Sequence, residues 1–323
     1  FNHDFRLRNK ETMKVFYISP TLYKTDRFFD TFTSTFISEG HQIVTNIKEA
    51  DMVFFDLHCR YGSYDWMNLC YIIDHDLPLC VFDNWDYGAM AEYKWIGNNN
   101  WQGVMECVST HDWANFLELV IKNNNKVFFF VRKMEKTEDY SYAKVFPIDW
   151  TMYPECDLPQ VSKEELFNRP YDCCIIGTLS TARESLIKGI LEDGRLKLKY
   201  ESRDCTQRKL HTTWIDKHRE AKMFIECCGG GMGSERPLQL FSVAPMLKNR
   251  NNQIYVNPFT DMVNCVEVDS SPSKEDIDKV IKTINDKDLL YEIYLNGINH
   301  IHTFYNEQWR AKYILETIKN QFN

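Results

Sequence analysis

Short runs of apolar and β-branched residues recur along this chain, and segments with helical spacing separate them. The first series reads KVFYIS at 14–19, HQIVTN at 41–46, MVFFDL at 52–57, LCVF at 79–82 and KVFFFV at 126–131. Strands as apolar as these are typical of sheets that are buried on both faces. Their alternation with helical segments at 26–39, 65–74 and 111–122 predicts βαβ units with a parallel sheet, which is an α/β fold.

A second α/β series follows a stretch that carries three prolines. Residues 146–167 have few periodic apolar positions and are interpreted as a linker. Beyond it we expect strands at 172–176, 196–200, 223–227, 244–247 and 254–256, and helices at 182–191, 213–221, 237–243, 273–285 and 288–303. The length of 323 residues suits two domains. We expect a tail at 1–12, a first domain at 13–150, a linker at 151–168, a second domain at 169–303 and a final helix at 304–323.

Composition and charge exclude several classes of protein. The hydrophobic content of 44% excludes a disordered chain, and the net charge of −8 gives no general attraction to nucleic acid or to an anionic membrane. The 11 cysteines include two adjacent pairs, Cys173-Cys174 and Cys227-Cys228, which make poor disulfide partners and indicate a reducing compartment. No apolar run is long enough for a membrane span, and no signal peptide is evident. The sequence therefore predicts a cytoplasmic protein without a membrane span.

A glycine-rich segment is the strongest candidate for a ligand site. It follows the expected strand at 223–227 and comprises Gly229, Gly230, Gly231, Gly233, Ser234, Glu235 and Arg236. Glycines let the backbone approach a ligand closely, and the start of the following helix presents free N–H groups. Arg236 adds a cation suited to a diphosphate. The spacing is neither that of a Walker A loop nor that of a dinucleotide fingerprint, and a flexible surface turn is the alternative interpretation.

A second segment of the same kind follows the expected strand at 172–176. Gly177 ends that strand, Thr178 and its neighbours are suited to cap a helix, and Arg183 falls in the first helical turn. Taken alone, this pattern indicates an ordinary helix cap. Together with the glycine-rich segment, it could place two anion-binding ends on the carboxyl edge of one sheet, where α/β folds bind ligands.

Three residues of the first domain are candidates for a general base. Asp83 and Asp86 come directly after the strand at 79–82, and His58 follows the strand at 52–57. A carboxylate or imidazole at such a strand end faces the crevice where substrates bind. For each residue a capping or turn role is the alternative. Asp83 and Asp86 could also bind a divalent cation, but no further ligands accompany them, so we expect no metal.

The stretch from Arg195 to Lys222 is basic, with nine Lys or Arg residues against four Asp or Glu residues. Such a stretch could bind the phosphates of a small ligand or of a nucleic acid. A solvated helix face is the alternative, because runs of charge usually have that role.

These motifs together resemble those of glycosyltransferases of the GT-B fold, in particular a group with an exostosin-like or spore-maturation-type C-terminal half. The strand that ends in Gly177 and leads to Arg183 is similar to one element of that group. The run from Ser234 to Gln239, followed by Val243-Ala244-Pro245, is similar to its donor signature. The run CVFDNWD at 80–86 resembles its strand-Asp-x-x-Asp element. The resemblance covers residues 13–256 in short motifs and leaves a phage or viral enzyme as one option.

The resemblance implies two Rossmann-like domains with parallel sheets facing a cleft. The second domain would bind a nucleotide sugar, with UDP as the expected nucleotide, and the last helix would cross back to the first domain. The family's ribose-binding Glu corresponds to Gln239 here, and its Gly corresponds to Ala244. Gln239 can accept a hydrogen bond, though a weaker one than a carboxylate accepts. Arg183, Arg236 and backbone amides would neutralise the leaving diphosphate without a metal.

The expected function is transfer of a sugar from a nucleotide sugar to an acceptor hydroxyl. In an inverting enzyme Asp83, Asp86 or His58 would deprotonate that hydroxyl. The acceptor is open between a saccharide, a lipid-linked saccharide, a protein and hydroxymethylated duplex DNA of the kind that phage enzymes modify. A non-catalytic module that binds a nucleotide or sugar is the alternative, which the Gln239 departure favours. An NAD-dependent oxidoreductase is excluded because residues 19–22 carry no glycine fingerprint.

Overall fold

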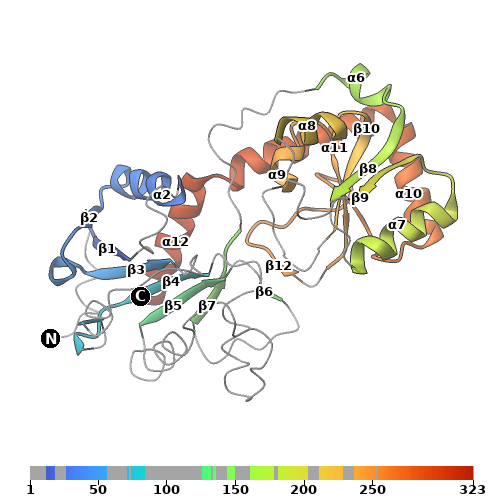
Figure 1. The fold of residues 1–323 in the computed structure, drawn as a ribbon. Helices are drawn as coiled ribbons and strands as arrows, with labels where there is room; N and C mark the ends of the chain where they lie inside the picture. Colours follow the sequence, from blue (N-terminus) through green and yellow to red (C-terminus); the bar gives the residue numbers. More distant parts are fainter. Residues whose placement is uncertain are drawn as a thin grey trace, which may run out of the picture. The chain divides into compact units, whose positions relative to one another are not determined.

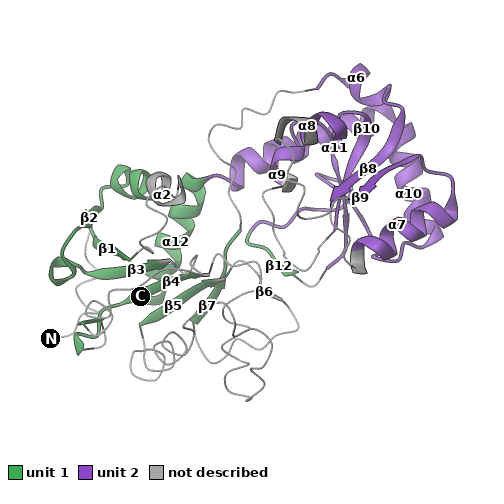
Figure 2. Cartoon of the chain, in the orientation of Figure 1, with its two compact units in different colours: residues 1–149, 253–256, 307–323 green, residues 150–252, 257–306 purple. Residues whose placement is uncertain are grey.

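The computed structural model describes residues 12–18, 27–56, 71–72, 74–83, 126–131, 134–135, 144–149, 161–177, 181–202, 211–227, 236–251 and 253–322. The chain divides into two compact units (Figures 1 and 2). Unit 1 contains Phe1–Asp149, Gln253–Val256 and Glu307–Asn323, and unit 2 contains Trp150–Asn252 and Asn257–Asn306. The chain therefore enters unit 1 three times.

Unit 1 is built on a six-stranded parallel sheet with the strand order β2-β1-β3-β4-β5-β7. Its strands are β1 (Lys14–Ile18), β2 (Gln42–Val44), β3 (Met52–Asp56), β4 (Leu79–Asp83), β5 (Val127–Val131) and β7 (Lys144–Pro147). Helix α2 (Arg27–Ser38) connects β1 to β2, and the short 3-10 helix η1 (Ile47–Glu49) leads into β3. The order reverses between β1 and β3, so the sheet has a topological switch point there.

A row of phenylalanines crosses one face of this sheet. The rings of Phe54, Phe82 and Phe130 lie one per strand on β3, β4 and β5, with centroids 5.3 and 5.6 Å apart. Helix α12 (Glu307–Phe322) adds Ala311, Ile314, Leu315 and Ile318 to the same core, and α12 also contacts α2. The Tyr313 hydroxyl donates a hydrogen bond of 2.9 Å to the Pro147 carbonyl, which joins α12 to β7.

Unit 2 is built on a five-stranded parallel sheet with the order β13-β11-β10-β8-β9. Its strands are β8 (Tyr171–Gly177), β9 (Leu198–Ser202), β10 (Ala221–Glu226), β11 (Met246–Asn249) and β13 (Val266–Val268). The helices are α6 (Lys163–Phe167), α7 (Thr181–Asp193), α8 (His211–His218), α9 (Arg236–Leu240), α10 (Lys274–Asn285) and α11 (Lys287–Phe304). Here the order reverses between β8 and β10.

The cysteines of the described core are free thiols that pack as small apolar residues. Cys173 and Cys174 lie in β8, and Cys80, Cys227 and Cys265 are also buried. Burial raises the pKa of Cys174 to about 12, so this thiol stays protonated at neutral pH. These cysteines therefore contribute to the cores and make no disulfides with one another.

Several expected boundaries are corrected by the structure. Residues 144–147, partly assigned to the linker, form β7 at the edge of the first sheet. Residues 163–167, also placed in the linker, form helix α6 of unit 2, capped by the Ser162 side chain, which accepts from Glu165 N. The strand expected at 254–256 is β12 (Gln253–Ile254), which pairs antiparallel with β6 (Met134–Glu135) in unit 1. Strand β13 was not predicted.

Candidate functional site

The two predicted anion-binding segments leave neighbouring strands of one sheet. Strand β8 runs into residues 178–180, and β10 runs into residues 228–235. The two strands pair directly and in parallel, with Met223 opposite Cys173 and Phe224 opposite Cys174. Both segments therefore start from the carboxyl edge at the switch point of unit 2, which is where open α/β sheets bind ligands.

The first segment is described at both ends. Gly177 is the last residue of β8, and Arg183 is the third residue of α7 with a partly exposed side chain. Thr178 lies outside the described residues. Helix α7 has 13 residues, which is long enough for its aligned peptide dipoles to favour an anion at its start. The β8–α7 connection is thus a strand-to-helix turn with a cationic side chain in the first helical turn.

The second segment is described only after its glycines. Gly229, Gly230, Gly231, Gly233, Ser234 and Glu235 lie outside the described residues, and of Arg236 the backbone alone is described, as the first residue of α9. Gln239 lies in α9 and is partly exposed; its carbonyl accepts from Ser242 N at 3.2 Å and from Ser242 Oγ at 2.7 Å. We expected a helix at 237–243, but α9 ends at Leu240. Five residues carry a small dipole, so Arg236 matters more than the helix start.

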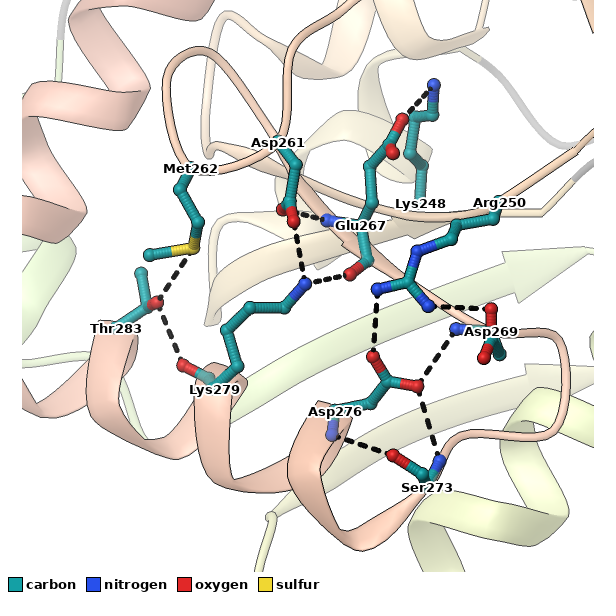
Figure 3. A network of polar contacts seen from close by, with 10 residues as sticks. All are labelled: Lys248, Arg250, Asp261, Met262, Glu267, Asp269, Ser273, Asp276, Lys279 and Thr283. Carbon is teal, nitrogen blue, oxygen red and sulfur yellow. Dashed lines mark hydrogen bonds and ion pairs between the residues drawn. The ribbon is translucent and has the colours of Figure 1, made fainter.

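Three cations near β11 and β13 form ion pairs with protein carboxylates (Figure 3). Lys248 Nζ lies 2.6 Å from Glu267 Oε1, and Lys279 Nζ lies 2.8 Å from Asp261 Oδ2. Arg250 pairs with Asp269 at 2.6 Å and with Asp276 at 3.2 Å. Because each of these three cations has a carboxylate partner, they offer little positive charge to a ligand.

Asp276 shows that this network is structural. Its Oδ2 accepts from the backbone N–H of Asp269 and of Ser273, and its Oδ1 accepts from Arg250 (Figure 3). Burial alone would raise the pKa of Asp276, but these hydrogen bonds and the guanidinium lower it below its ordinary value. The Ser273 side chain in turn accepts from Asp276 N, completing a capping box at the start of α10.

The basic stretch at 195–222 is also largely paired in its described part. Lys199 lies 2.7 Å from Glu220, Lys217 pairs with Glu201, and Lys222 lies 3.5 Å from Asp172. Arg195 bonds Asp193 and Asp278, and Arg219 lies 3.6 Å from Asp216. Five of its cations are thus neutralised by carboxylates, three of which belong to residues outside the stretch. This arrangement favours an ion-paired surface over a phosphate-binding one.

Of the three residues predicted to act as a base, the structure describes only Asp83, and only its backbone. Asp83 is the last residue of β4. His58 and Asp86 lie outside the described residues. Strand β3, which precedes His58, pairs directly with β4, with Asp56 opposite Phe82. The chain segments that carry the three residues therefore leave adjacent strands at one edge of the unit 1 sheet.

The described residues include no candidate for a metal cluster or a membrane span. No cluster of three or more His, Cys, Asp or Glu side chains among them is arranged to hold a metal ion. None of the described helices combines the length and the apolar character that crossing a membrane requires.

Sequence reasoning missed two buried polar residues of unit 2 that bond the turn after α9. Arg169 and Tyr294 are buried, and their side chains bond backbone carbonyls near the end of α9. Arg169 was the first residue of the expected second domain, and Tyr294 looked like one aromatic of an amphipathic helix. The only signal in the sequence was an arginine directly before an apolar strand.

No family model matches the sequence, and no curated protein matches it either. Solved structures do match the fold. Sucrose-phosphate synthase from Thermosynechococcus elongatus is similar with a TM-score of 0.54 and 6% identity, over 97% of this chain and 99% of that one. An alpha-glucosyltransferase, solved with UDP and a 13-mer DNA containing an HMU base, is similar with a TM-score of 0.50 and 7% identity, over 95% and 99%.

These matches and the two parallel sheets show that the chain has the GT-B fold of glycosyltransferases. The expected fold class, an α/β protein with two Rossmann-like units, is confirmed. At 6% and 7% identity the likeness is one of fold.

Proposed function

We propose that the protein is a glycosyltransferase that binds a nucleotide sugar at the carboxyl edge of unit 2 and transfers the sugar to an acceptor hydroxyl. The observation that carries this proposal is the direct pairing of β8 with β10. These paired strands lead into the segments at 178–183 and 228–236, and this supports a bound diphosphate that contacts both at the switch point.

Charge supports a diphosphate at that point. Arg183 and Arg236 are the first cations in the sequence after β8 and β10, and both fall in the first turn of the helix that follows the strand. Guanidinium groups and the backbone amides of residues 229–234 suit phosphate oxygens well. They would stabilise the leaving diphosphate, so we propose that no metal is needed for that task. Gln239, in the same connection, would contact the donor with a weaker hydrogen bond than a carboxylate makes.

UDP is the proposed nucleotide. The alpha-glucosyltransferase with the same fold was solved with UDP, which supports this choice. On the acceptor side we propose Asp83, Asp86 or His58 as the base of an inverting reaction, because the strands before them, β3 and β4, are neighbours.

A saccharide is the proposed acceptor, and modified duplex DNA is the second candidate. The DNA bound to the alpha-glucosyltransferase favours the second candidate. The paired cations of the 195–222 stretch and the net charge of −8 favour the first. Gel shifts with duplex DNA at low and high salt separate them, because phosphate-mediated binding at low salt is required for a DNA acceptor.

A thermal-shift panel with UDP, GDP, ADP, CDP and their sugars tests the donor site, followed by hydrolysis and transfer assays. A ligand that binds the native state raises the melting temperature by mass action. We expect UDP and a UDP-sugar to raise it and the sugar to be hydrolysed or transferred. Stabilisation without any turnover would support the non-catalytic module instead, and no shift with any nucleotide would contradict the donor site.

A further inference from the structure

The turn that follows α9 is held by side chains from two distant segments of unit 2. The Tyr294 hydroxyl, from α11, donates to the Ser242 carbonyl at 3.2 Å and accepts from Val161 N at 3.0 Å. Arg169 Nη1 donates to the Val243 carbonyl at 2.5 Å and to the Ala221 carbonyl at 2.9 Å. We call Arg169 and Tyr294 the carbonyl brace.

The two hydrogen bonds from Arg169 join the two ends of the candidate donor segment. Ala221 begins β10, and Val243 comes three residues after the last residue of α9. The chain from Ala221 to Val243 contains β10, the glycine-rich segment and α9. A single guanidinium therefore fixes both ends of the connection that carries Arg236.

Both polar side chains of the carbonyl brace are buried in unit 2. Arg169 is 7% exposed and Tyr294 is 0% exposed. Burial lowers the pKa of Arg169, but an arginine starts so high that it remains charged, and its other nitrogen lies 3.4 Å from Glu165. An apolar side chain of similar volume often stabilises a core at least as well as a buried ion. Directional bonds to two carbonyls instead set the position of the turn.

Helix α9 depends on such anchors. It has five residues, and a helix that short is not stable by itself in water. The carboxyl end of α9 is also held by packing, because Phe241 directly follows the helix. The centroid of the Phe241 ring lies 5.3 Å from that of Phe224 and 5.6 Å from that of Phe259. At Gly297 of α11 a Cβ atom would lie 2.2 Å from the Phe241 ring, so α11 packs directly against this residue. The contacts that hold α9 in place therefore lie at the end opposite to Arg236, which begins the helix.

We propose that Arg169 and Tyr294 are positioning residues for donor binding, which hold α9 and thereby place Arg236 against the diphosphate. This inference rests on the proposed function. Neither residue needs to touch the donor. Loosening the brace lets α9 occupy several positions, and a donor must then pay the entropy of ordering it. The affinity for UDP falls, while turnover at saturating donor changes little.

The hydroxyl of Tyr294 is tested with Tyr294→Phe, which removes two hydrogen bonds and keeps the ring. Tyr291→Phe is the matched control, because it removes the same group three residues earlier on α11. Titration of UDP into the 323-residue protein should show about threefold to tenfold weaker binding for Tyr294→Phe, as expected for one or two lost hydrogen bonds. The control should bind as the wild type does.

The guanidinium is tested with Arg169→Met and Arg169→Lys. Methionine removes both donors, so UDP binding should weaken by about tenfold or more, whereas lysine keeps a charged donor and should restore part of the affinity. Arg195→Met is the matched control, because Arg195 lies before β9, at the amino edge of the sheet, and has carboxylate partners there. Urea unfolding and the donor KM and kcat are measured for each variant.

A raised KM with kcat kept within about twofold, in variants that remain folded, supports the positioning role. UDP binding equal to that of the wild type in both Tyr294→Phe and Arg169→Met overturns it and leaves the donor site intact. If the wild type itself binds no UDP, the proposed function fails and this inference fails with it.

Discussion

The two units share one sheet plan but use their buried polar side chains differently. Each sheet is parallel and reverses its order after the first strand, at β1 in unit 1 and at β8 in unit 2. In unit 1 the Tyr313 hydroxyl holds the Pro147 carbonyl and so joins α12 to an edge strand. In unit 2 the Tyr294 hydroxyl and Arg169 hold the turn after α9. The same device thus fixes a structural helix in one unit and a candidate ligand segment in the other.

Apolar packing and hydrogen bonds constrain the position of a segment to different degrees. Apolar packing, such as the phenylalanine row of unit 1, is non-directional and tolerates small shifts. A hydrogen bond to a carbonyl fixes both distance and angle. We therefore expect a large-to-small substitution in the core of unit 2 to weaken donor binding as well as stability. The same kind of substitution in unit 1 should lower stability alone.

The largest effects should come from a pair of core phenylalanines. Phe241→Ala in unit 2 and Phe130→Ala in unit 1 should each cost about 3–5 kcal/mol, because both rings are 0% exposed. Hydrogen exchange reports the loss separately for each unit. Only Phe241→Ala should also weaken UDP binding, by about tenfold, because its ring holds the end of α9.

Equal UDP affinities in the two phenylalanine variants would contradict the comparison. Unit 1 would then affect donor binding as much as unit 2 does. Both variants are titrated below the temperature at which either unit unfolds, so that affinity and stability are read separately.

A smaller effect is expected at the carboxylate network in Figure 3. Ser273→Ala removes the acceptor for Asp276 N and should cost about 1 kcal/mol in the free energy of unfolding. UDP affinity should not change, because Arg250, the cation of this network that contacts Asp276, is already paired with carboxylates. Urea unfolding with UDP titration checks both statements. A clear loss of affinity would place the network in the donor site.

The smallest effect concerns pH and touches both units. Met13 N donates to His41 Nδ1 at 3.2 Å in unit 1, and His300 Nε2 lies 3.2 Å from the Asn257 carbonyl in unit 2. Burial lowers the pKa of both histidines below the ordinary value of 6.5. The unfolded chain therefore binds these protons more readily, so the stability is present above about pH 6.5 and is lost as pH falls below it.

Urea midpoints measured at about pH 7.5 and about pH 5 test this expectation, because these conditions lie on either side of the free histidine pKa of about 6.5. The midpoint should fall towards acid pH, and His41→Asn should reduce the slope for unit 1 alone. A midpoint that rises as the pH falls would show that the histidines gain protons on folding.

Most strands could be predicted because buried parallel strands are continuous apolar runs, as in Phe128–Phe130. The missed strands lack that signal. Strand β7 has one exposed and three partly exposed residues and ends in Pro147, and β13 is only three residues long. Proline at the end of an edge strand is permitted, because one side of that strand makes no ladder. Helix α6 was hidden in the same way, since five residues show no periodicity.

The two segments of the candidate site could be predicted from the sequence, but not that the strands before them are neighbours. Spacing indicated that Gly177 and the glycines after 228 each follow a strand, and the structure adds that those strands are neighbours. Arg169 could not be found, because its partners are backbone carbonyls 52 and 74 positions away. Carbonyl groups belong to every residue, so no residue pattern reveals such a bond.

Titration of UDP into the wild type, Arg236→Ala and the control Arg195→Ala tests the central claim most directly. The claim is that the carboxyl edge of unit 2 binds a nucleoside diphosphate through Arg236. It predicts binding by the wild type, the same affinity within about twofold for Arg195→Ala, and about tenfold or more weaker binding for Arg236→Ala, as expected when a charged hydrogen bond is lost. Unchanged affinity in Arg236→Ala, or no binding by the wild type, would contradict it.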